Sequence, residues 1–275
     1  APKVSAKFFN KRVTFEIEMS FTERQIKQSF SNVNQLNAFI SMIQISVENS
    51  MTVKLDSLIA RTINNMIAET LYDDYGSTAV TEKSGIKAVN LLYLYNQQYG
   101  AELTADKAVT TPDFIRFAAY QIGLYKDRLT KISTLFNIGG KERFTPTGSL
   151  NVVLLSEFKR AADVFLQSET FHEEYTKLVD AEVVPYWQGS GKDYSFENTS
   201  KINVKLASSG EEPIVVEASG ILGFMFDRNA LGVCNLDRRV TTAYNPKGEY
   251  YNNFYKMDAG YFNDGNENAI VFFVA

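Results

Sequence analysis

The chain has 275 residues, of which 45% are hydrophobic and 22% charged, a composition typical of a folded protein and not of a disordered one. Its net charge of −4 provides no basic excess to neutralise phosphates, so composition gives no electrostatic case for a nucleic-acid-binding surface. The single cysteine excludes an intrachain disulfide, and no apolar run reaches the length of a membrane span. One or two domains are expected for this length.

The first part of the chain is predicted to form one strand followed by helices. Residues 13–19 (VTFEIEM) alternate with a period of two, which predicts a strand, and capping signals after it predict a short helix to about Phe30. Residues 32–72 contain no glycine or proline, and their apolar residues recur every three or four positions. This pattern predicts one long helix, or two in line, ending before Gly76. At 1.5 Å per residue it spans roughly 60 Å, as a spine across an elongated subunit.

The middle of the chain alternates between predicted strands and helices. Residues 85–100 are expected to form a short strand that turns into a helix and stops at the terminal glycine. Residues 111–136 begin with Thr-Pro-Asp, a favourable helix start, and are expected to be helical to the end of that range. A buried strand is predicted over residues 151–155, with capped helices over residues 157–167 and 171–179.

From Glu182 onward the signals are mostly those of strands and turns. The sequence therefore predicts an α+β fold in which the opening strand and the long helix pack against the closing strands, with a middle domain inserted between them. The segments expected as strands are EVVPYW, INVKL, PIVVEA, ILGFMFD, RVTTAY, EYYNNFYKM and AIVFFV.

The residues that carry catalytic or metal chemistry are nearly absent. The sole histidine, His172, has only glutamates around it, so a structural role is expected. Cys234 has no second cysteine near it and is expected to be a small buried residue. Residues 189–191 (GSG) match no phosphate-binding loop and predict a turn. The adjacent carboxylates at 73–74 and 211–212 are expected to be solvated, although a hydrolase using paired carboxylates is retained as an alternative. No catalytic residue, metal or cofactor is predicted.

A segment near the end of the chain, YNPKGEYYNNFYKM, is unusual because five aromatic residues stand among asparagines. On a strand, Tyr250 and Phe254 would point to one side and Tyr251 and Tyr255 to the other, so both faces are amphipathic. Such a strand needs neighbours on both sides, which another copy of the chain can supply. The residues predicted to form subunit contacts or internal packing are Tyr244, Tyr250, Tyr251, Phe254 and Tyr255.

Two consecutive arginines precede this segment and are also predicted to form subunit contacts or internal packing. Alternation along a strand sends Arg238 and Arg239 to opposite faces, where one can pair with Asp237 or with an acid of another subunit. An ordinary surface pair is the other interpretation. With 20 phenylalanines and 15 tyrosines in the chain, and aromatics enriched at protein interfaces, the composition favours an assembly protein over an enzyme.

Four stretches of the sequence resemble a known family. They are APKVSAKFFNKRVTFEIEMSFTERQIKQSF, NAFISMIQISVENS, PYWQGSGKDYSFENTSKINVK and LGVCNLDRRVTTAYNPKGEYYNNFYKMDAGYFNDGNENAIVFFV. These stretches resemble the sequences of the major capsid proteins of small podoviruses of the Bacillus picovirus kind, and of their relatives in Firmicutes phages. The resemblance runs from about Pro2 to Val274, and its closing pattern is the most specific part.

The resemblance implies the Hong Kong 97 phage capsid fold. Residues 32–72 would then be the spine helix, and a peripheral domain would comprise residues 1–85 and 235–275. Residues 86–234 would form the axial domain around the five-fold and six-fold axes. The aromatic strand at residues 244–257 would belong to the peripheral domain, with one face on the spine helix and the other on neighbouring subunits.

The chain departs from the family pattern at its beginning. The family has an N-terminal arm and an extended loop before the spine helix, whereas here only residues 13–19 can be the returning strand of that loop. Either the missing residues precede Ala1 or this is a reduced version. No residue is assigned a covalent cross-linking role.

The resemblance also implies a function. Copies of the chain would assemble as pentamers and hexamers into the icosahedral capsid of a tailed bacteriophage, enclosing double-stranded DNA without sequence-specific binding. Scaffolding and portal proteins are the implied partners, no membrane or cofactor is involved, and assembly would take place in the host bacterial cytoplasm. An encapsulin-like bacterial compartment, which shares the fold, is the alternative.

Overall fold

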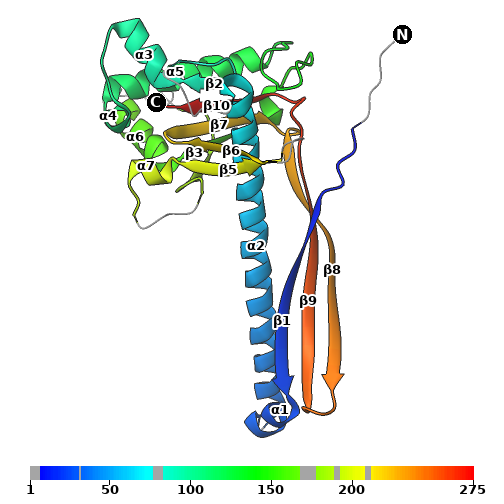
Figure 1. Ribbon diagram of the computed structural model, residues 1–275. Helices are drawn as coiled ribbons and strands as arrows, with labels where there is room; N and C mark the ends of the chain where they lie inside the picture. Colours follow the sequence, from blue (N-terminus) through cyan, green and yellow to red (C-terminus); the bar gives the residue numbers. More distant parts are fainter. Residues whose placement is uncertain (1–6, 31, 77–82, 168–177, 189–192, 208–211) are drawn as a thin grey trace. The chain divides into compact units, whose positions relative to one another are not determined.

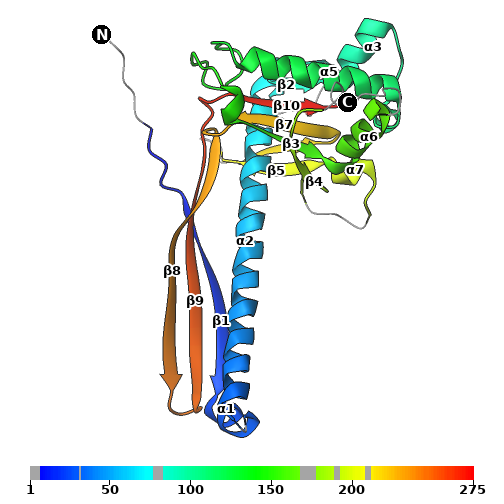
Figure 2. The same ribbon diagram turned by 180° about the vertical axis from the view of Figure 1, so that it is seen from behind.

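The structure is a computed structural model, drawn in Figure 1 and from behind in Figure 2. It forms two compact units, one from the residues up to Thr62 with Gly232–Phe262, the other from Ile63–Leu231 with Asn263–Ala275. Helices and strands are mixed in the chain, as the α+β prediction required. The structure describes residues 7–30, 32–76, 83–167, 178–188, 193–207 and 212–275.

The first unit is built on a three-stranded sheet with the order β1-β9-β8. Strands β1 (Arg12–Thr22) and β9 (Tyr250–Asn263) are antiparallel and in register from Arg12 opposite Gly260 to Thr22 opposite Tyr250. Strand β8 (Leu231–Asn245) is the other edge, and the short helix α1 (Glu23–Ser29) follows β1. The predicted strand over residues 13–19 and the short helix after it are therefore confirmed.

Helix α2 (Val33–Tyr75) is one continuous helix of 43 residues, about 65 Å long at 1.5 Å per residue. This confirms the prediction over residues 32–72. It ends at Gly76, whose φ of +75° is a conformation that glycine adopts without strain. The residues of α2 up to Thr62 belong to the first unit, and Figures 1 and 2 both draw β1, β9 and β8 beside them.

The core of the first unit is small. Four residues are buried in it, namely Ile43, Val47 and Met51 of α2 and Met257 of β9. Alternate residues of β1 face this core while the residues between them are exposed, as the period-two pattern requires. The partly buried residues packed around the core are Phe15, Ile17, Met19, Phe21, Phe39, Leu55 and Tyr255.

The second unit is built on a five-stranded mixed sheet with the order β2-β10-β7-β3-β4. Strand β7 is antiparallel to both β10 and β3, while β2 runs parallel to β10 and β4 runs parallel to β3. The last predicted strand, AIVFFV, is β10 and belongs to this sheet. The strands are β2 (Ala88–Asn90), β3 (Leu150–Leu155), β4 (Glu182–Val184), β7 (Ile221–Asp227) and β10 (Ala269–Phe273).

Both faces of this sheet are covered. Helices α3 (Leu91–Tyr99), α5 (Pro112–Leu129) and α6 (Ser156–Gln167) bury one face in a large apolar cluster. The end of α2 and the hairpin of β5 (Ile202–Leu206) and β6 (Ile214–Ala218) bury the other face in a second cluster. The three short elements of this unit are α4 (Ala105–Ala108), the 3-10 turn η1 (Thr147–Ser149) and α7 (Phe196–Thr199).

Local signals explain most boundaries in the second unit. The Asn90 side chain accepts a hydrogen bond from the Tyr93 backbone N–H at 3.1 Å, which caps α3, and Gly100 ends it in a left-handed conformation. The predicted strand and helix in residues 85–100 are thus confirmed. The strand and helix predicted over residues 151–155 and 157–167 are confirmed as β3 and α6.

The predicted helix over residues 111–136 is too long. Helix α5 begins at Pro112 as expected but ends at Leu129, because the chain beyond it bonds to residues that follow much later. The Leu129 carbonyl accepts from the Thr145 N–H at 2.7 Å, and Ser133 exchanges backbone hydrogen bonds with Arg143 at 2.9 and 3.0 Å. These tertiary bonds replace the helical ones and produce an ordered loop.

Some predictions fall on residues that the structure does not describe. They are the helix over residues 171–179 for all but its last two residues, His172, the glycine turn at 189–191, and Glu211. The compact units also have other bounds than the predicted domains: residues 63–85 and 263–275 belong with the five-stranded sheet. The positions of the peripheral and axial domains in a shell stay a prediction.

Candidate subunit-contact surface

The aromatic strand β9 has both of its in-plane neighbours within its own chain. It is the central strand of the three-stranded sheet, between β1 and β8. Its asparagines also find partners there, since the Ser20 hydroxyl donates to Asn252 at 2.6 Å and the Thr242 hydroxyl donates to Asn253 at 2.7 Å. The in-plane neighbours of β9 therefore come from its own chain. That another copy covers one face of this strand stays a prediction. What a second copy can cover is a face of the sheet.

One face of β9 packs towards α2. Tyr255 stands opposite Ile17 of β1 and lies half-buried against the small core. Tyr251 stands opposite Phe21, and its ring lies 4.7 Å from the ring of Tyr244 on β8. Tyr244 and Tyr251 are 45% and 37% exposed, so this aromatic pair is only partly covered by its own chain.

The outer end of this aromatic pair is polar. The Tyr244 hydroxyl donates to the Glu23 carboxylate at 3.4 Å. Partial desolvation raises the pKa of Tyr244, and the nearby negative charge of Glu23 raises it further. Tyr244 therefore stays protonated as a hydrogen-bond donor at neutral pH.

The other face of β9 carries Tyr250 and Phe254. The Tyr250 hydroxyl accepts from the Asn245 amide at 2.9 Å, which ties together the two ends of the β8–β9 turn. Phe254 stands opposite Glu18 of β1, and the Lys256 ammonium lies 5.8 Å from its ring centroid. This face is thus a mixture of one aromatic ring and charged side chains.

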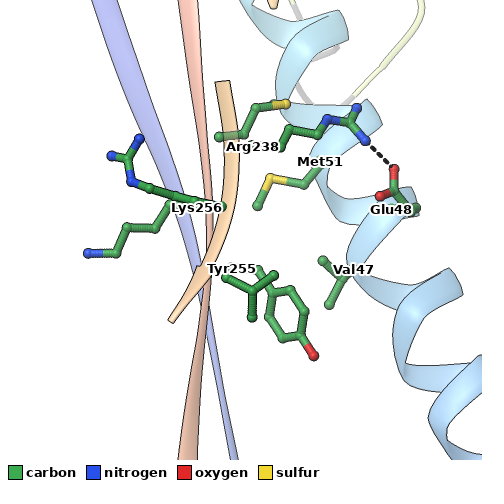
Figure 3. Close-up of a pocket in the computed structure, with 9 residues that line it drawn as sticks. Val47, Glu48, Met51, Arg238, Tyr255 and Lys256 are labelled. Carbon is green, nitrogen blue, oxygen red and sulfur yellow. Dashed lines mark hydrogen bonds and ion pairs between the residues drawn. The ribbon is translucent and has the colours of Figure 1, made fainter. Parts of the chain in front are cut away.

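Arg238 points towards α2, where its guanidinium forms an ion pair with Glu48 at 2.7 Å (Figure 3). The pair stands at the edge of a hollow of about 130 Å³ between α2 and the sheet. Val47, Met51 and Tyr255 line its apolar part. The ion pair is exposed at its rim, so the hollow is open to an incoming side chain.

Arg239 points the other way. Its guanidinium pairs with Asp258 at 2.7 Å and with Asp237 at 3.1 Å, and Asp258 also accepts from the Thr14 hydroxyl at 2.6 Å. The hydrogen bond from Arg239 and that from Thr14 hold the pKa of Asp258 below its ordinary value. The hydrogen bonds from Arg239 to Asp258 and to Asp237 raise the pKa of Arg239. The prediction that the two arginines point to opposite faces is confirmed, and of the partners considered for one of them the structure shows Asp237.

Of two predictions about other polar residues, one is wrong and one holds only in part. Cys234 is exposed on the edge strand β8 and not a small buried residue. The expectation of two solvated carboxylates holds for Asp73, which is exposed, and fails for Asp74, whose side chain is 7% exposed. At the end of α2, Asp73 and Asp74 bind the Lys87 ammonium at 2.7 and 2.9 Å. Asp74 also accepts from the backbone N–H groups of Lys87 and Ala88 at 2.7 and 2.8 Å. These carboxylates join a helix end to strand β2.

Sequence reasoning missed the acidic partners of the arginines. In the sequence, Glu48 is an ordinary polar residue of a long helix. It comes near Arg238 only because β8 packs beside α2. The role of Asp258 could not be predicted because its contacts with Thr14 and Arg239 form only when β9 lies between β1 and β8.

The surface offers contacts and no chemistry. Among the residues that the structure describes, no group of three histidine, cysteine, aspartate or glutamate side chains is placed to hold a metal ion. Within that same part of the chain, no helix is long and apolar enough to cross a membrane. Aromatic rings, paired charges and an open hollow are the means by which one protein surface recognises another.

Comparisons with known proteins agree with this geometry. The family model described as Phi29-like phage major capsid protein matches residues 1–273. A chain in the capsid structure of Staphylococcus phage Andhra is similar at TM-score 0.55 and 10% identity, covering 96% of this chain and 70% of that one. A chain in the structure of head fiber and inner core protein gp22 of native bacteriophage P68 is similar at TM-score 0.51 and 9% identity, with the same coverages. At such identities the likeness shows the fold alone. The curated proteins contain no match.

Proposed function

The chain belongs to the family of Phi29-like phage major capsid proteins, and from this premise we propose that its copies form rings of five and six that close into an icosahedral shell. Membership of that family makes the chain a structural protein of a phage capsid that associates with its own copies, and not an enzyme. The observation that carries the proposal is the match over residues 1–273, nearly the whole chain. Neither the bacterial compartment nor the hydrolase receives support from the comparisons.

The aromatic and arginine residues of the first unit supply contacts between copies in this proposal. Tyr244, Tyr251 and the hollow beside Arg238 are partly exposed, and they lie on strands that a four-residue core only half covers. Many modest contacts of this kind, repeated by symmetry, sum to a stable shell. Phe254 and Tyr250 offer a second set on the opposite face of the sheet.

In this proposal the chain has a peripheral domain and an axial domain. The three-stranded sheet and the N-terminal part of α2 form the peripheral domain, within residues 1–85 and 235–275. The five-stranded sheet and its helices form the axial domain, chiefly residues 86–234. In support, the compact units separate these two sheets, although at slightly different residues.

The shell holds double-stranded DNA in this proposal, with no sequence-specific contact. The net charge of −4 suits a wall that does not adhere to packaged DNA. Scaffolding and portal proteins are the expected helpers, and assembly takes place in the host bacterial cytoplasm. These partners are proposed from the family resemblance and not from a binding surface.

Electron microscopy of the purified native particles, with an assay of nuclease-resistant nucleic acid on the same sample, tests the proposal. Closed icosahedral particles that hold protected double-stranded DNA are the expected result. Closed particles that hold protein cargo would favour the compartment. A chain that stays monomeric at 31 kDa under every assembly condition would contradict the proposal.

A further inference from the structure

A loop between α5 and β3 in the second unit is unusually well fixed for a segment without regular structure. Ser133 and Arg143 exchange two backbone hydrogen bonds, and the Asn137 amide bonds both the N–H and the carbonyl of Lys141 at 2.7 Å. The Gly139 N–H donates to the Gly265 carbonyl at 2.8 Å, which attaches the loop to the turn before β10. The loop is therefore ordered before it meets any partner.

This loop displays apolar side chains to solvent. Ser133 and Arg143 form a hydrogen-bonded antiparallel pair, so Ile132 and Phe144 stand directly opposite each other as the adjoining pair. Ile132 is 70% exposed and Phe144 is 54% exposed, and Leu135 nearby is also 54% exposed. Apolar groups held in fixed positions bind with little loss of entropy, which is the property of an interface.

The loop that carries this apolar group also carries more basic than acidic residues. Lys131, Lys141 and Arg143 are exposed in the loop, against one acid, Glu142. Arg143 also bonds Glu267 at 3.1 Å, which fixes it in place. We call residues 131–144 the basic loop.

A second surface of the same unit has the opposite charge. Residues 182–186 and 193–197 contain three acids and no lysine or arginine. The acids are Glu182, Asp193 and Glu197, and all three are exposed. Lys201 lies near Glu197 but is paired with Glu217. The Trp187 backbone N–H donates to the Thr199 carbonyl at 3.1 Å, which links the chain just after the first stretch to the chain just after the second. We call residues 182–186 and 193–197 the acidic surface.

The acidic surface also displays apolar groups. Tyr194 is 71% exposed, Val183 is 45% exposed and Tyr186 is 37% exposed. Val183 lies on β4, the edge strand of the five-stranded sheet, so this surface continues to an open sheet edge. The acidic surface therefore offers exposed apolar side chains to those of the basic loop and negative charge to its lysines.

We propose that the basic loop of one copy binds the acidic surface of the next copy around a ring. Figures 1 and 2 draw the loop between α5 and β3 on one side of the second unit, with α6 and α7 on the other side in both views. Two complementary surfaces on opposite sides of one chain make a head-to-tail contact, and such contacts form a ring when the rotation between copies closes. The inference rests on the proposed shell function and names the surfaces that form its rings.

Cysteine pairing tests the contact directly. In a Cys234→Ser background, Ile132→Cys combined with Val183→Cys is oxidised during assembly and run on a denaturing gel. The expected result is a ladder of covalent oligomers that stops at five and six, because each disulfide joins neighbouring copies. Ile132→Cys with Tyr120→Cys, on an exposed α5 residue outside the acidic surface, is the matched control and should give no ladder.

Charge reversal gives a second readout. Lys131→Glu with Lys141→Glu should reduce shell yield at least tenfold, and Glu182→Lys with Glu197→Lys in the same chain should restore most of it. Lys107→Glu, at an exposed lysine on α4, should leave the yield unchanged. Shells at wild-type yield without the cysteine ladder would overturn the inference and leave the shell function standing. If the unmodified chain formed no assembly at all, the shell function would be contradicted and the inference would fall with it.

Discussion

The two compact units differ in how much apolar surface they cover by themselves. In the second unit every residue of β7 and β10 is buried, and both faces of the sheet are packed. Among the described residues of the first unit, the apolar cluster has four buried members, and β8 is exposed over most of its length. The second unit therefore has the burial of an independent domain, whereas the first leaves surface for other copies.

This difference follows from the sequences of the strands. The strand ILGFMFD is apolar at almost every position, as a strand covered on both faces must be. The strand YYNNFYKM places aromatic and polar groups on both faces, so water or a neighbour must satisfy each of them. A subunit that must fold stably and also bind its own copies in a shell can have one region for stability and another for contacts between copies.

The largest expected effect is in the core of the second unit. Phe272→Ala removes a fully buried ring from β10, and we expect a loss of about 3–5 kcal/mol in the free energy of unfolding. Denaturant unfolding of the unassembled subunit measures it. Val240→Ala, at a 61% exposed residue of β8, is the control and should change subunit stability by less than about 0.5 kcal/mol. Equal losses at the two positions would contradict the comparison.

The next effect concerns assembly more than folding. Tyr251→Ala and Phe254→Ala each remove an aromatic ring from β9, and we expect shell yield and shell melting temperature to fall. The subunit itself should lose only about 1–2 kcal/mol, since both rings are partly exposed and aromatic contacts are worth about 0.5–1.5 kcal/mol beyond burial. Tyr251→Phe keeps the ring and should assemble normally. Shells of wild-type yield and heat stability from both alanine variants would show that this strand is misplaced in the proposal.

A smaller effect depends on pH. Because Arg239 and Thr14 depress the pKa of Asp258 in the folded protein, its ionised form stabilises the fold above the unfolded-state pKa of about 3.9. That stabilisation is lost as the pH falls through the lower folded pKa. The wild type should therefore exceed Asp258→Asn in stability at neutral pH, and the difference should shrink below pH about 4. Acid titrations of unfolding for both proteins measure it, and a difference that grew on acidification would contradict the assigned contacts.

The smallest effect is expected at Arg238. Its pair with Glu48 is exposed on both sides, so Arg238→Met should cost the isolated subunit about 0–1 kcal/mol. If the same variant lowers shell yield, the hollow beside Arg238 is a contact between copies and not part of the core of the first unit. Glu48→Gln serves as the matched variant on the other side of the pair. A large loss of subunit stability would place Arg238 in the folding core instead.

Much of the fold was predictable because its signals are local. The long helix follows from 41 consecutive residues without glycine or proline, and α3 follows from the glycine that ends it at residue 100. The end of α5 was not predictable, because the bonds that end the helix at Leu129 come from Thr145 and from a loop that folds back. Local preference cannot reveal a competing partner that lies sixteen residues away.

The candidate surface was predictable in part. Alternation placed Arg238 and Arg239 on opposite faces, since the period of a strand is a local property. Their partners Glu48 and Asp258 depend on sheet order, which the sequence of one strand does not contain. The exposure of Cys234 was missed for the same reason, because an edge strand and a central strand look alike in sequence.

We infer that the three-stranded unit completes its burial only when copies assemble. Hydrogen–deuterium exchange of the unassembled subunit and of the shell, compared peptide by peptide, would show this. We expect the amides of β7 and β10 to be equally protected in both states, and those of β8 and β9 to gain additional protection in the shell, where neighbouring copies cover their faces. Equal protection of β8 and β9 in the free subunit and the shell would contradict it.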